Sequence, residues 1–332
     1  MSPDLKNRTL LSIDELSARE VSFLLALAQE LKRDQRAGSE RARLRGKHIA
    51  LLLDRSVPRA PGAFEVAANE QGANLSLIGP GDWPPGAQDM QGTARVLGRL
   101  YDAIECRGLA PAIVCELAQH AGVPVYDGLT RPFHPAQVLA DCLTMQDHCP
   151  GRPLAQIRLA YLGDARYRIG DSLLQGAALL GLDFRIGAPR ALWPPQALVD
   201  AALAKARHSG ARVHLTESAA EAVQAVDYIY TDAWLAPAEP EALWAARLEL
   251  LRPYQVTGAL LCTTGNPATK LLHGLPSALD RAQRKGQAQA AGWPVDTLEV
   301  SEEIYAMPAA VLQDQAENRL HSIKALLVAT VA

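Results

Sequence analysis

The chain has 332 residues, of which 48% are apolar and 21% are charged, with a formal net charge of −3. This length accommodates two domains that each bury a core, and the slight negative charge excludes the basic excess that marks a nucleic-acid-binding protein. No apolar run approaches the roughly 20 residues that span a bilayer, and the segment Met1–Lys6 does not resemble a signal peptide. We therefore expect a cytoplasmic globular protein without a nucleic-acid or membrane partner.

Short apolar runs alternate with longer amphipathic segments in the first half, a pattern typical of a parallel sheet flanked by helices. Ser12 is predicted to cap a helix that begins near Asp14, with Glu15 completing a capping box. The strands predicted in this half are His48–Leu53, Asn74–Ile78, Ala112–Cys115 and Val123–Tyr126.

The same alternation restarts in the second half. The strands predicted there are Ile157–Leu162, Asp183–Ile186, Arg212–Leu215, Tyr228–Tyr230 and Ala259–Cys262. Turn-forming residues cluster at Pro150–Pro153 and indicate a domain boundary. From Pro308 to Ala332 a long apolar-periodic segment predicts a terminal helix that must bury one face. We expect an α/β chain with two doubly wound parallel-sheet domains joined by helices, residues 1–150 and 151–307.

Cysteine and histidine spacing gives no sign of a disulfide framework or a metal site. The five cysteines lack Cys-x-x-Cys pairs and are interpreted as reduced thiols: Cys106, Cys115, Cys142, Cys149 and Cys262. His134, His148 and His208 lack ligand spacing with nearby cysteines or carboxylates. We expect neither a metal nor a cofactor.

A set of short motifs runs in order along the chain. Residues 128–141 contain His134-Pro135-Ala136-Gln137, and the other motifs are Tyr161–Arg166, Asp227–Trp234, Thr264–Pro267, His273–Pro276 and Gln315–Arg319. The set is similar in order and spacing to that of anabolic ornithine carbamoyltransferases, over essentially the whole chain. The resemblance implies two doubly wound α/β domains, with the C-terminal helix 308–332 packing back on the first, and assembly as a homotrimer.

The resemblance implies a carbonyl-binding cluster in the first domain. Arg107, His134 and Arg319 would surround the carbonyl oxygen of the donor, and Gln137 would hold the carbamoyl nitrogen. Carbamoyl transfer needs such groups to polarise the carbonyl and stabilise the tetrahedral oxyanion. Taken singly, each residue has a structural alternative: the His-Pro pair can start a helix, and Arg319 can form a surface ion pair.

The phosphate loop of the family, Ser-Thr-Arg-Thr-Arg, corresponds to Val57–Pro61, where only Arg59 is kept. The substituted loop has lost hydroxyl groups, and its two prolines have no N–H to donate. A lysine that the family supplies from a neighbouring subunit falls near Gln88. We therefore expect weakened binding of carbamoyl phosphate, unless another residue such as Arg168 restores the contacts.

The amine-binding half is also altered. Asp232 and Trp234 are kept, and Asp232 can bind a cationic amine or accept its proton. Gly274 and Leu275 stand where the family has Cys-Leu, Ala236–Ala238 replaces Ser-Met-Gly, and Tyr167-Arg168 replaces two asparagines. Arg168 has two interpretations, a partner for an acidic acceptor or a solvent-facing residue at a helix start.

The replacements concentrate where substrates would bind, while the scaffold motifs are intact, which favours reuse of the site. The first interpretation is a transferase that keeps the carbonyl-polarising cluster but uses an altered donor or amine acceptor, each a small molecule. One alternative is a noncatalytic relative that binds a metabolite or a protein partner. Another is an ordinary ornithine carbamoyltransferase, which forms L-citrulline and phosphate from carbamoyl phosphate and L-ornithine.

Overall fold

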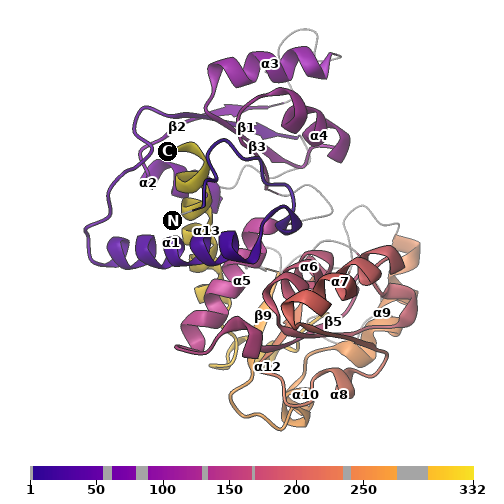
Figure 1. Ribbon diagram of the computed structural model, residues 1–332. Helices are drawn as coiled ribbons and strands as arrows, with labels where there is room; N and C mark the ends of the chain where they lie inside the picture. Colours follow the sequence, from indigo (N-terminus) through magenta and orange to yellow (C-terminus); the bar gives the residue numbers. More distant parts are fainter. Residues whose placement is uncertain are drawn as a thin grey trace. The chain divides into compact units, whose positions relative to one another are not determined.

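The computed structural model describes residues 3–54, 62–79, 89–128, 134–166, 169–234, 241–274 and 298–332. The chain forms two compact units (Figure 1). Unit 1 comprises Met1–Thr144 and Ala316–Ala332, and unit 2 comprises Met145–Gln315.

Unit 1 is built on a four-stranded parallel sheet in the order β2-β1-β3-β4. Its elements are α1 (Ala18–Arg36), β1 (His48–Leu53), α2 (Ala63–Glu70), β2 (Asn74–Ile78), α3 (Met90–Leu100), β3 (Ala103–Arg107), α4 (Pro111–His120), β4 (Val125–Asp127) and most of α5 (Pro135–His148) and α13 (Leu312–Val331). Because β2 and β3 lie on opposite sides of β1, the strand order reverses between β1 and β3, and such a switch point is where open α/β sheets bind ligands.

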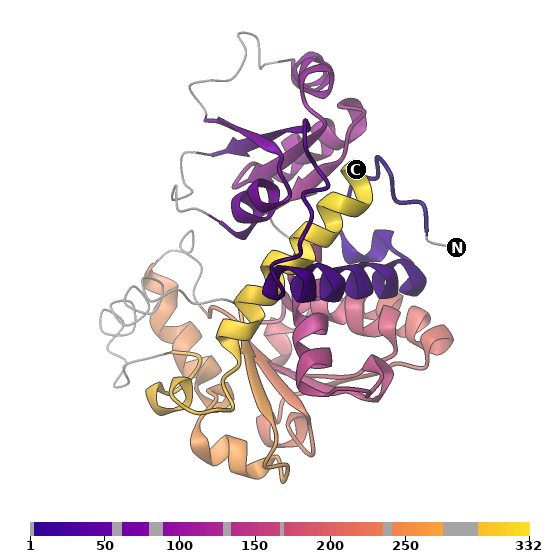
Figure 2. The same ribbon diagram turned by 90° about the vertical axis from the view of Figure 1, so that its left-hand side faces the viewer.

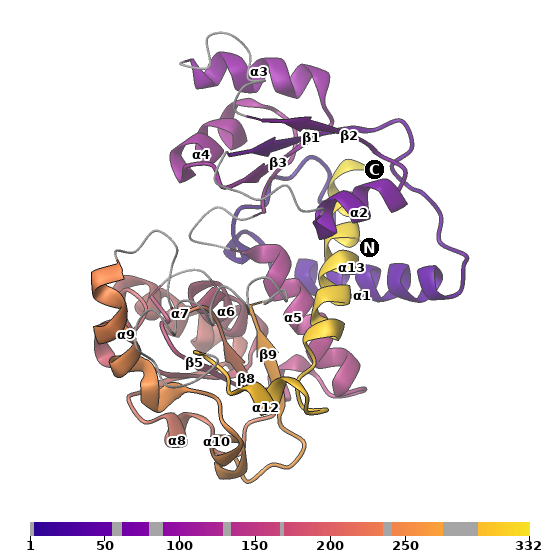
Figure 3. The same cartoon turned by 180° about the vertical axis from the view of Figure 1, so that it is seen from behind.

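The two faces of this sheet differ in what covers them. Helices α3 and α4 lie on one face, and α2 and α13 lie on the other (Figures 1 and 3). The α3–α4 face buries alternate residues of the strands, including Leu52, Ile104 and Cys106, as period-two geometry requires. Residues 105 and 107 of β3 therefore point to the opposite face, toward α2 and α13.

The C-terminal helix is fixed within unit 1 by buried polar contacts. It crosses α1 (Figure 2), where the Lys32 ammonium donates to Asn318 Oδ1 at 2.7 Å and Asn318 Nδ2 donates to Thr144 Oγ1 at 3.0 Å. Lys324, which is fully buried, donates to both carboxylate oxygens of Glu40 at 2.8 Å. The predicted terminal helix is thus confirmed, and Arg319 lies in its N-terminal half.

Unit 2 has a five-stranded parallel sheet in the order β7-β6-β5-β8-β9. Its elements are β5 (Arg158–Leu162), α6 (Ile169–Leu180), β6 (Asp183–Gly187), α7 (Gln196–Ser209), β7 (Arg212–Thr216), α8 (Ala219–Ala222), β8 (Tyr228–Thr231), α9 (Trp244–Leu251), α10 (Gly258–Thr263), β9 (Lys270–His273) and α12 (Glu302–Tyr305). Short 3-10 helices lie at Leu154–Gln156, Arg190–Leu192, Glu241–Leu243 and Arg252–Tyr254. The strand order reverses between β5 and β8, which gives unit 2 a switch point of its own.

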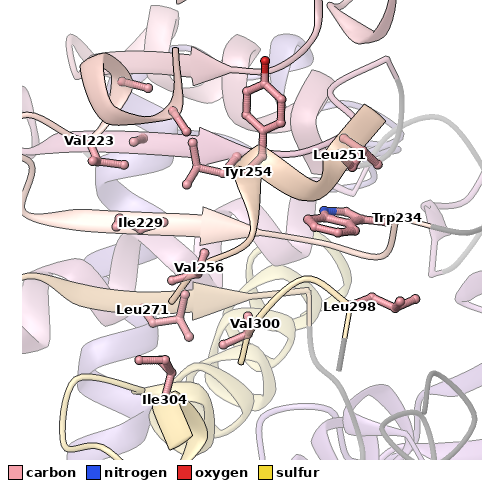
Figure 4. Close-up of a cluster of buried hydrophobic side chains, with 14 of the residues drawn as sticks. Val223, Ile229, Trp234, Leu251, Tyr254, Val256, Leu271, Leu298, Val300 and Ile304 are labelled. Atoms are coloured by element: carbon pink, nitrogen blue, oxygen red, sulfur yellow. The ribbon is translucent and has the colours of Figure 1, made fainter. Parts of the chain in front are cut away.

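A buried apolar cluster packs β5, β8 and β9 against α8, α9 and α12 (Figure 4). Ile229 and Leu271 from the sheet meet Val256, Val300 and Trp234, all of them at most 1% exposed. Trp234 lies only two residues beyond Asp232, and its backbone N–H donates to Glu299 Oε1 at 2.9 Å. The cluster therefore anchors the segment that leaves β8.

The two doubly wound parallel sheets confirm the predicted fold class, but two predicted strands are wrong. Ala112–Cys115 lies in α4, where Pro111 occupies a first-turn position that needs no N–H donor. Ala259–Cys262 lies in α10, which Thr257 caps by accepting from Leu260 N. Apolar runs of four residues do not by themselves distinguish a strand from a helix.

Two strands, β3 and β9, were not predicted from the sequence, because their apolar pattern is interrupted by Glu105, Arg107, Lys270 and His273. The predicted capping box is also misplaced. Ser12 caps only the short 3-10 helix Ile13–Glu15, and the capping box is formed by Ser17 and Glu20 at the start of α1. Among the described residues, no helix is long and apolar enough to cross a membrane.

Candidate functional site

A pocket in unit 1 lies on the α2–α13 face of the sheet, next to the switch point. Its polar lining comprises Glu105, Asp127, His134, Gln137 and Arg319. Apolar side chains of α2, β4 and α13 complete the wall: Phe64, Tyr126, Ile323, Leu326 and Leu327. The cavity of about 30 Å³ has room for about two water-sized groups. Three of the four predicted carbonyl-facing residues thus line one pocket.

Arg107, the fourth, stands beside this pocket in a buried pair with Glu105. Its Nε donates to Glu105 Oε1 at 3.1 Å and its Nη2 donates to Oε2 at 3.3 Å. Both residues lie on β3 and are nearly inaccessible to solvent. Burial raises the pKa of Glu105 to about 7, although the positive charges of Arg107 and Arg319 oppose the shift.

His134 and Gln137 are positioned by the start of α5. The His134 carbonyl accepts from Gln137 N at 3.1 Å and from Val138 N at 3.2 Å, so His134 begins the helix while its side chain lines the pocket. Pro135 follows at the first helical position, where its fixed φ suits the helix. The structural and functional interpretations of the His-Pro pair are therefore compatible.

The Gln137 side chain is oriented by a buried carboxylate one helical turn later. Its Nε2 donates to Asp141 Oδ1 at 2.8 Å, and both residues are buried. With its amide nitrogen held there, the amide oxygen is the group that can accept from a ligand N–H. This orientation suits a carbamoyl nitrogen.

Arg319 reaches the pocket from α13, and its Nη2 lies 3.5 Å from the carbonyl oxygen of Gly128. The neighbouring Asn318 is the buried residue that ties α13 to Lys32 and Thr144. A cation held on a fixed helix beside a small polar pocket can stabilise negative charge that develops there.

In unit 2, Asp232 and Gly274 directly follow neighbouring strands. Thr231 of β8 pairs with His273 of β9, and Gly274 N donates to Thr231 O at 3.1 Å. A Cβ atom placed on Gly274 would lie 2.6 Å from Asp232 Cγ, and closer still to Oδ1. The Asp232 carboxylate therefore occupies the space that any side chain at position 274 would need.

A second cluster of charged side chains in unit 2 lies around the turn after β5. Asp164 accepts from Arg166 Nη2 and from Arg247 Nη1, both at 2.7 Å. Gly163, with φ of +123°, precedes it in a conformation that favours glycine. Nearby, Asp171 of α6 is 4% exposed, and its Oδ1 has no hydrogen-bond partner among the described residues. Burial, with the charge of Asp164 as the second cause, raises the pKa of Asp171 to about 7.

The structure thus places the predicted residues in two groups, Arg107, His134, Gln137 and Arg319 in unit 1, and Asp232 and Gly274 in unit 2. The other predicted residues, Arg59, Arg168 and Leu275, lie outside the described residues, as do Val57–Pro61, Gln88 and Ala236–Ala238.

Sequence reasoning missed Glu105, Asp127 and Asp171. The sequence contains one indication of Glu105, its position two residues before Arg107, because residues two apart share a face in a strand. Asp171 left a weaker one, an acidic residue in the first turn of a helix that is otherwise largely apolar. In the part of the chain that the structure describes, no group of three histidine, cysteine or acidic residues could hold a metal ion.

Comparison with known proteins assigns both halves of the chain. Residues 8–147 match the family model described as aspartate/ornithine carbamoyltransferase, carbamoyl-P binding domain. Residues 155–330 match the one described as aspartate/ornithine carbamoyltransferase, Asp/Orn binding domain. The pocket of unit 1 lies mostly within the first match, and Asp232 and Gly274 lie within the second.

Similar proteins match along their full length. The chain is 48% identical to a catabolic ornithine carbamoyltransferase of Burkholderia mallei, covering 100% of this chain and 99% of that protein. It is 47% identical to an ornithine carbamoyltransferase of Actinobacillus pleuropneumoniae, with all of both chains covered. Its structure resembles that of the Pyrococcus furiosus ornithine carbamoyltransferase with a TM-score of 0.85 at 30% identity, covering 99% of this chain and 98% of that one. The chain therefore belongs to the ornithine carbamoyltransferase family, within the aspartate/ornithine carbamoyltransferases.

Proposed function

We propose that this protein transfers the carbamoyl group of carbamoyl phosphate to the side-chain amine of L-ornithine, giving L-citrulline and phosphate. The observation that carries the proposal is the pocket in which His134, Gln137 and Arg319 converge, with Arg107 beside it. Full-length relatives at 47–48% identity are named ornithine carbamoyltransferases, which supports these substrates over an altered pair.

In this reaction the amine nitrogen attacks the carbonyl carbon, the bond from that carbon to the phosphate oxygen breaks, and the amine loses a proton. Arg107, His134 and Arg319 would stabilise the oxyanion of the tetrahedral intermediate. The amide oxygen of Gln137 would accept from the carbamoyl nitrogen, since its own nitrogen is held by Asp141. Asp232 would bind the cationic amine or accept its proton.

The proposal extends to a cytoplasmic homotrimer, as the resemblance implies. Sedimentation of the purified protein would measure the mass in solution. A monomeric mass would contradict the trimer without bearing on the reaction.

A second candidate is the same chemistry with another donor or acceptor. It is favoured by the sequence of the phosphate loop, where Val57 and Ala60 replace hydroxyl residues. Two lost hydrogen bonds to a charged ligand cost about 1.5–3 kcal/mol each, or roughly two to four decades of affinity together. Because phosphate contacts act on the ground state and the transition state alike, their loss should raise KM for carbamoyl phosphate and leave kcat nearly intact.

The deciding experiment measures citrulline formation by the full chain, with carbamoyl phosphate varied up to saturation. The proposed function predicts turnover that falls by about 10²-fold or more in His134→Ala, with an unchanged circular dichroism spectrum. Absence of citrulline at all donor concentrations would refute it. In that case, calorimetric detection of binding by a different amine or donor would support the second candidate. Absence of binding by every donor tested would indicate a noncatalytic relative.

If citrulline forms with a very high KM for carbamoyl phosphate, we expect the substituted phosphate loop to be the cause. Restoring Val57→Ser, Pro58→Thr, Ala60→Thr and Pro61→Arg should then lower KM by about two to four decades. An unchanged KM in this variant would show that the phosphate is bound by residues outside the loop.

A further inference from the structure

The most unusual feature next to the unit 1 pocket is that Arg107, which stands beside it, is already engaged by Glu105, a carboxylate of the pocket lining. Glu105 accepts from both Nε and Nη2 of Arg107, in a pair that is 3% and 7% exposed. A bidentate carboxylate is the partner whose geometry matches the guanidinium fork most closely. An oxyanion in the pocket can therefore bind Arg107 only in competition with Glu105, which already occupies the Nε–Nη2 edge of the guanidinium.

Two glycines make room for this pair. A Cβ atom on Gly62 would lie 2.7 Å from Arg107 Nη2, and one on Gly128 would lie 3.2 Å from Glu105 Cδ and nearer still to Oε1. Neither glycine has a positive φ, so their role here is space and not backbone conformation. The pair is thus built into the fold on both of its sides.

The pair also determines the charge that the pocket offers to a ligand. The charged and titratable groups that face Glu105 are Arg107 on its own strand, Arg319 on α13, Glu65 on α2, and Asp127 and His134 at the pocket wall. While Glu105 is ionised, it cancels the charge of Arg107. When Glu105 is protonated, Arg107 keeps its positive charge beside the cavity and its bond to Glu105 is no longer an ion pair.

We propose that Glu105 is a positioning residue that holds Arg107 beside the pocket and competes with the donor's oxyanion for the guanidinium, so that anions bind best when Glu105 is protonated. The proposal rests on the proposed function for the identity of the donor. The chemical class it assigns to the pocket is a small oxyanion, such as phosphate or a phosphate ester.

The size of the effect follows from the titration of the carboxyl. Because burial raises the pKa of Glu105 to about 7, most molecules carry the proton at pH 6 and about a tenth do so at pH 8. Apparent affinity falls in proportion to the competent fraction. Anion binding should therefore weaken by about tenfold between pH 6 and pH 8.

The test is calorimetric titration of the full chain with sulfate, which stays a dianion throughout this range. Wild type should bind sulfate about tenfold more weakly at pH 8 than at pH 6. Glu105→Gln, which keeps one acceptor for Arg107 but no charge, should bind at pH 8 as wild type does at pH 6. Glu30→Gln is the matched control, since it removes one negative charge from an exposed pair with Arg43 and should behave as wild type.

Two outcomes would overturn the proposal. The first is a wild-type sulfate affinity that does not change between the two pH values, or no sulfate binding at all, and this result requires no variant. The second is a Glu105→Gln protein that keeps the full tenfold change, which would assign the titration to a group other than Glu105. Citrulline formation plays no part in this test, so a failure of the proposed reaction would leave its result standing.

Discussion

A side chain at position 274 should move the Asp232 carboxylate, and this displacement can be measured. A Cβ atom there would lie 2.6 Å from Asp232 Cγ, whereas ordinary van der Waals contact begins at 3.4 Å. The carboxylate must therefore retreat by roughly 1 Å, which a change of side-chain rotamer can supply at a cost of about 0.5–1.5 kcal/mol. The backbone of Gly274 can stay in place, because its φ is not positive.

We expect Gly274→Ala and Gly274→Cys to reduce the free energy of unfolding by no more than about 1.5 kcal/mol. We expect ornithine to bind about 10- to 100-fold more tightly, since a hydrogen bond to a charged group contributes about 1.5–3 kcal/mol. The reason for this direction is that the family combines an aspartate at this position with a side chain at position 274. Urea unfolding and calorimetric titration with ornithine measure the two quantities.

The two variants separate two causes. If the position of Asp232 determines the affinity for ornithine, Gly274→Ala and Gly274→Cys should change that affinity equally, because both add the Cβ atom. If a contact from the thiol determines the affinity, only Gly274→Cys should bind ornithine more tightly. Gly258→Ala is the matched control, since a Cβ atom there meets nothing within 4 Å. Unchanged ornithine affinity in both variants would refute the reasoning, and weaker binding would mean that the observed position of Asp232 is the one that holds the amine.

Two further predictions concern buried charges. Lys324→Met should lower the free energy of unfolding by about 3–5 kcal/mol, because it leaves the Glu40 carboxylate without its buried partner. Urea unfolding measures this loss. The double variant Lys324→Met, Glu40→Gln should recover part of it. Asp171→Asn should raise the free energy of unfolding by roughly 1–4 kcal/mol at pH 8. The folded-state pKa of Asp171, about 7, lies above its usual 3.8. The stabilisation that its proton gives the fold is therefore fully present below pH 4, and it is lost as the pH rises through 7. A gain from Asp171→Asn that persisted at pH 4 would contradict this account.

Most strands could be predicted from the sequence because apolar runs bounded by turn residues match the needs of a buried parallel strand. His48–Leu53 and Asn74–Ile78 were predicted with the bounds that β1 and β2 have. The apolar pattern does not predict the strand β3, for a physical reason that bears on function. Its buried residues include Glu105 and Arg107, and two charges in five residues break the apolar pattern.

The candidate site was predictable only as far as residue types and order reveal it. His134, Gln137 and Arg319 were named from motifs, and they do line one pocket. Which partner each group has depends on tertiary packing, so the pairing of Arg107 with Glu105 could not be predicted. The same holds for the carboxylate of Asp232, whose position depends on a neighbouring strand some forty residues later in the chain.

Glycines decide where the charges lie in both units. In unit 1, Gly128 makes room for the Glu105 carboxylate, and in unit 2, Gly274 makes room for that of Asp232. In sequence terms a glycine in place of a cysteine looks like the loss of a contact. In the structure it is also a gain of space that a carboxyl group fills. Because a carboxylate shifted by 1 Å changes which ligand atom it can reach, a substitution to glycine can alter specificity while every charged residue of the site is retained.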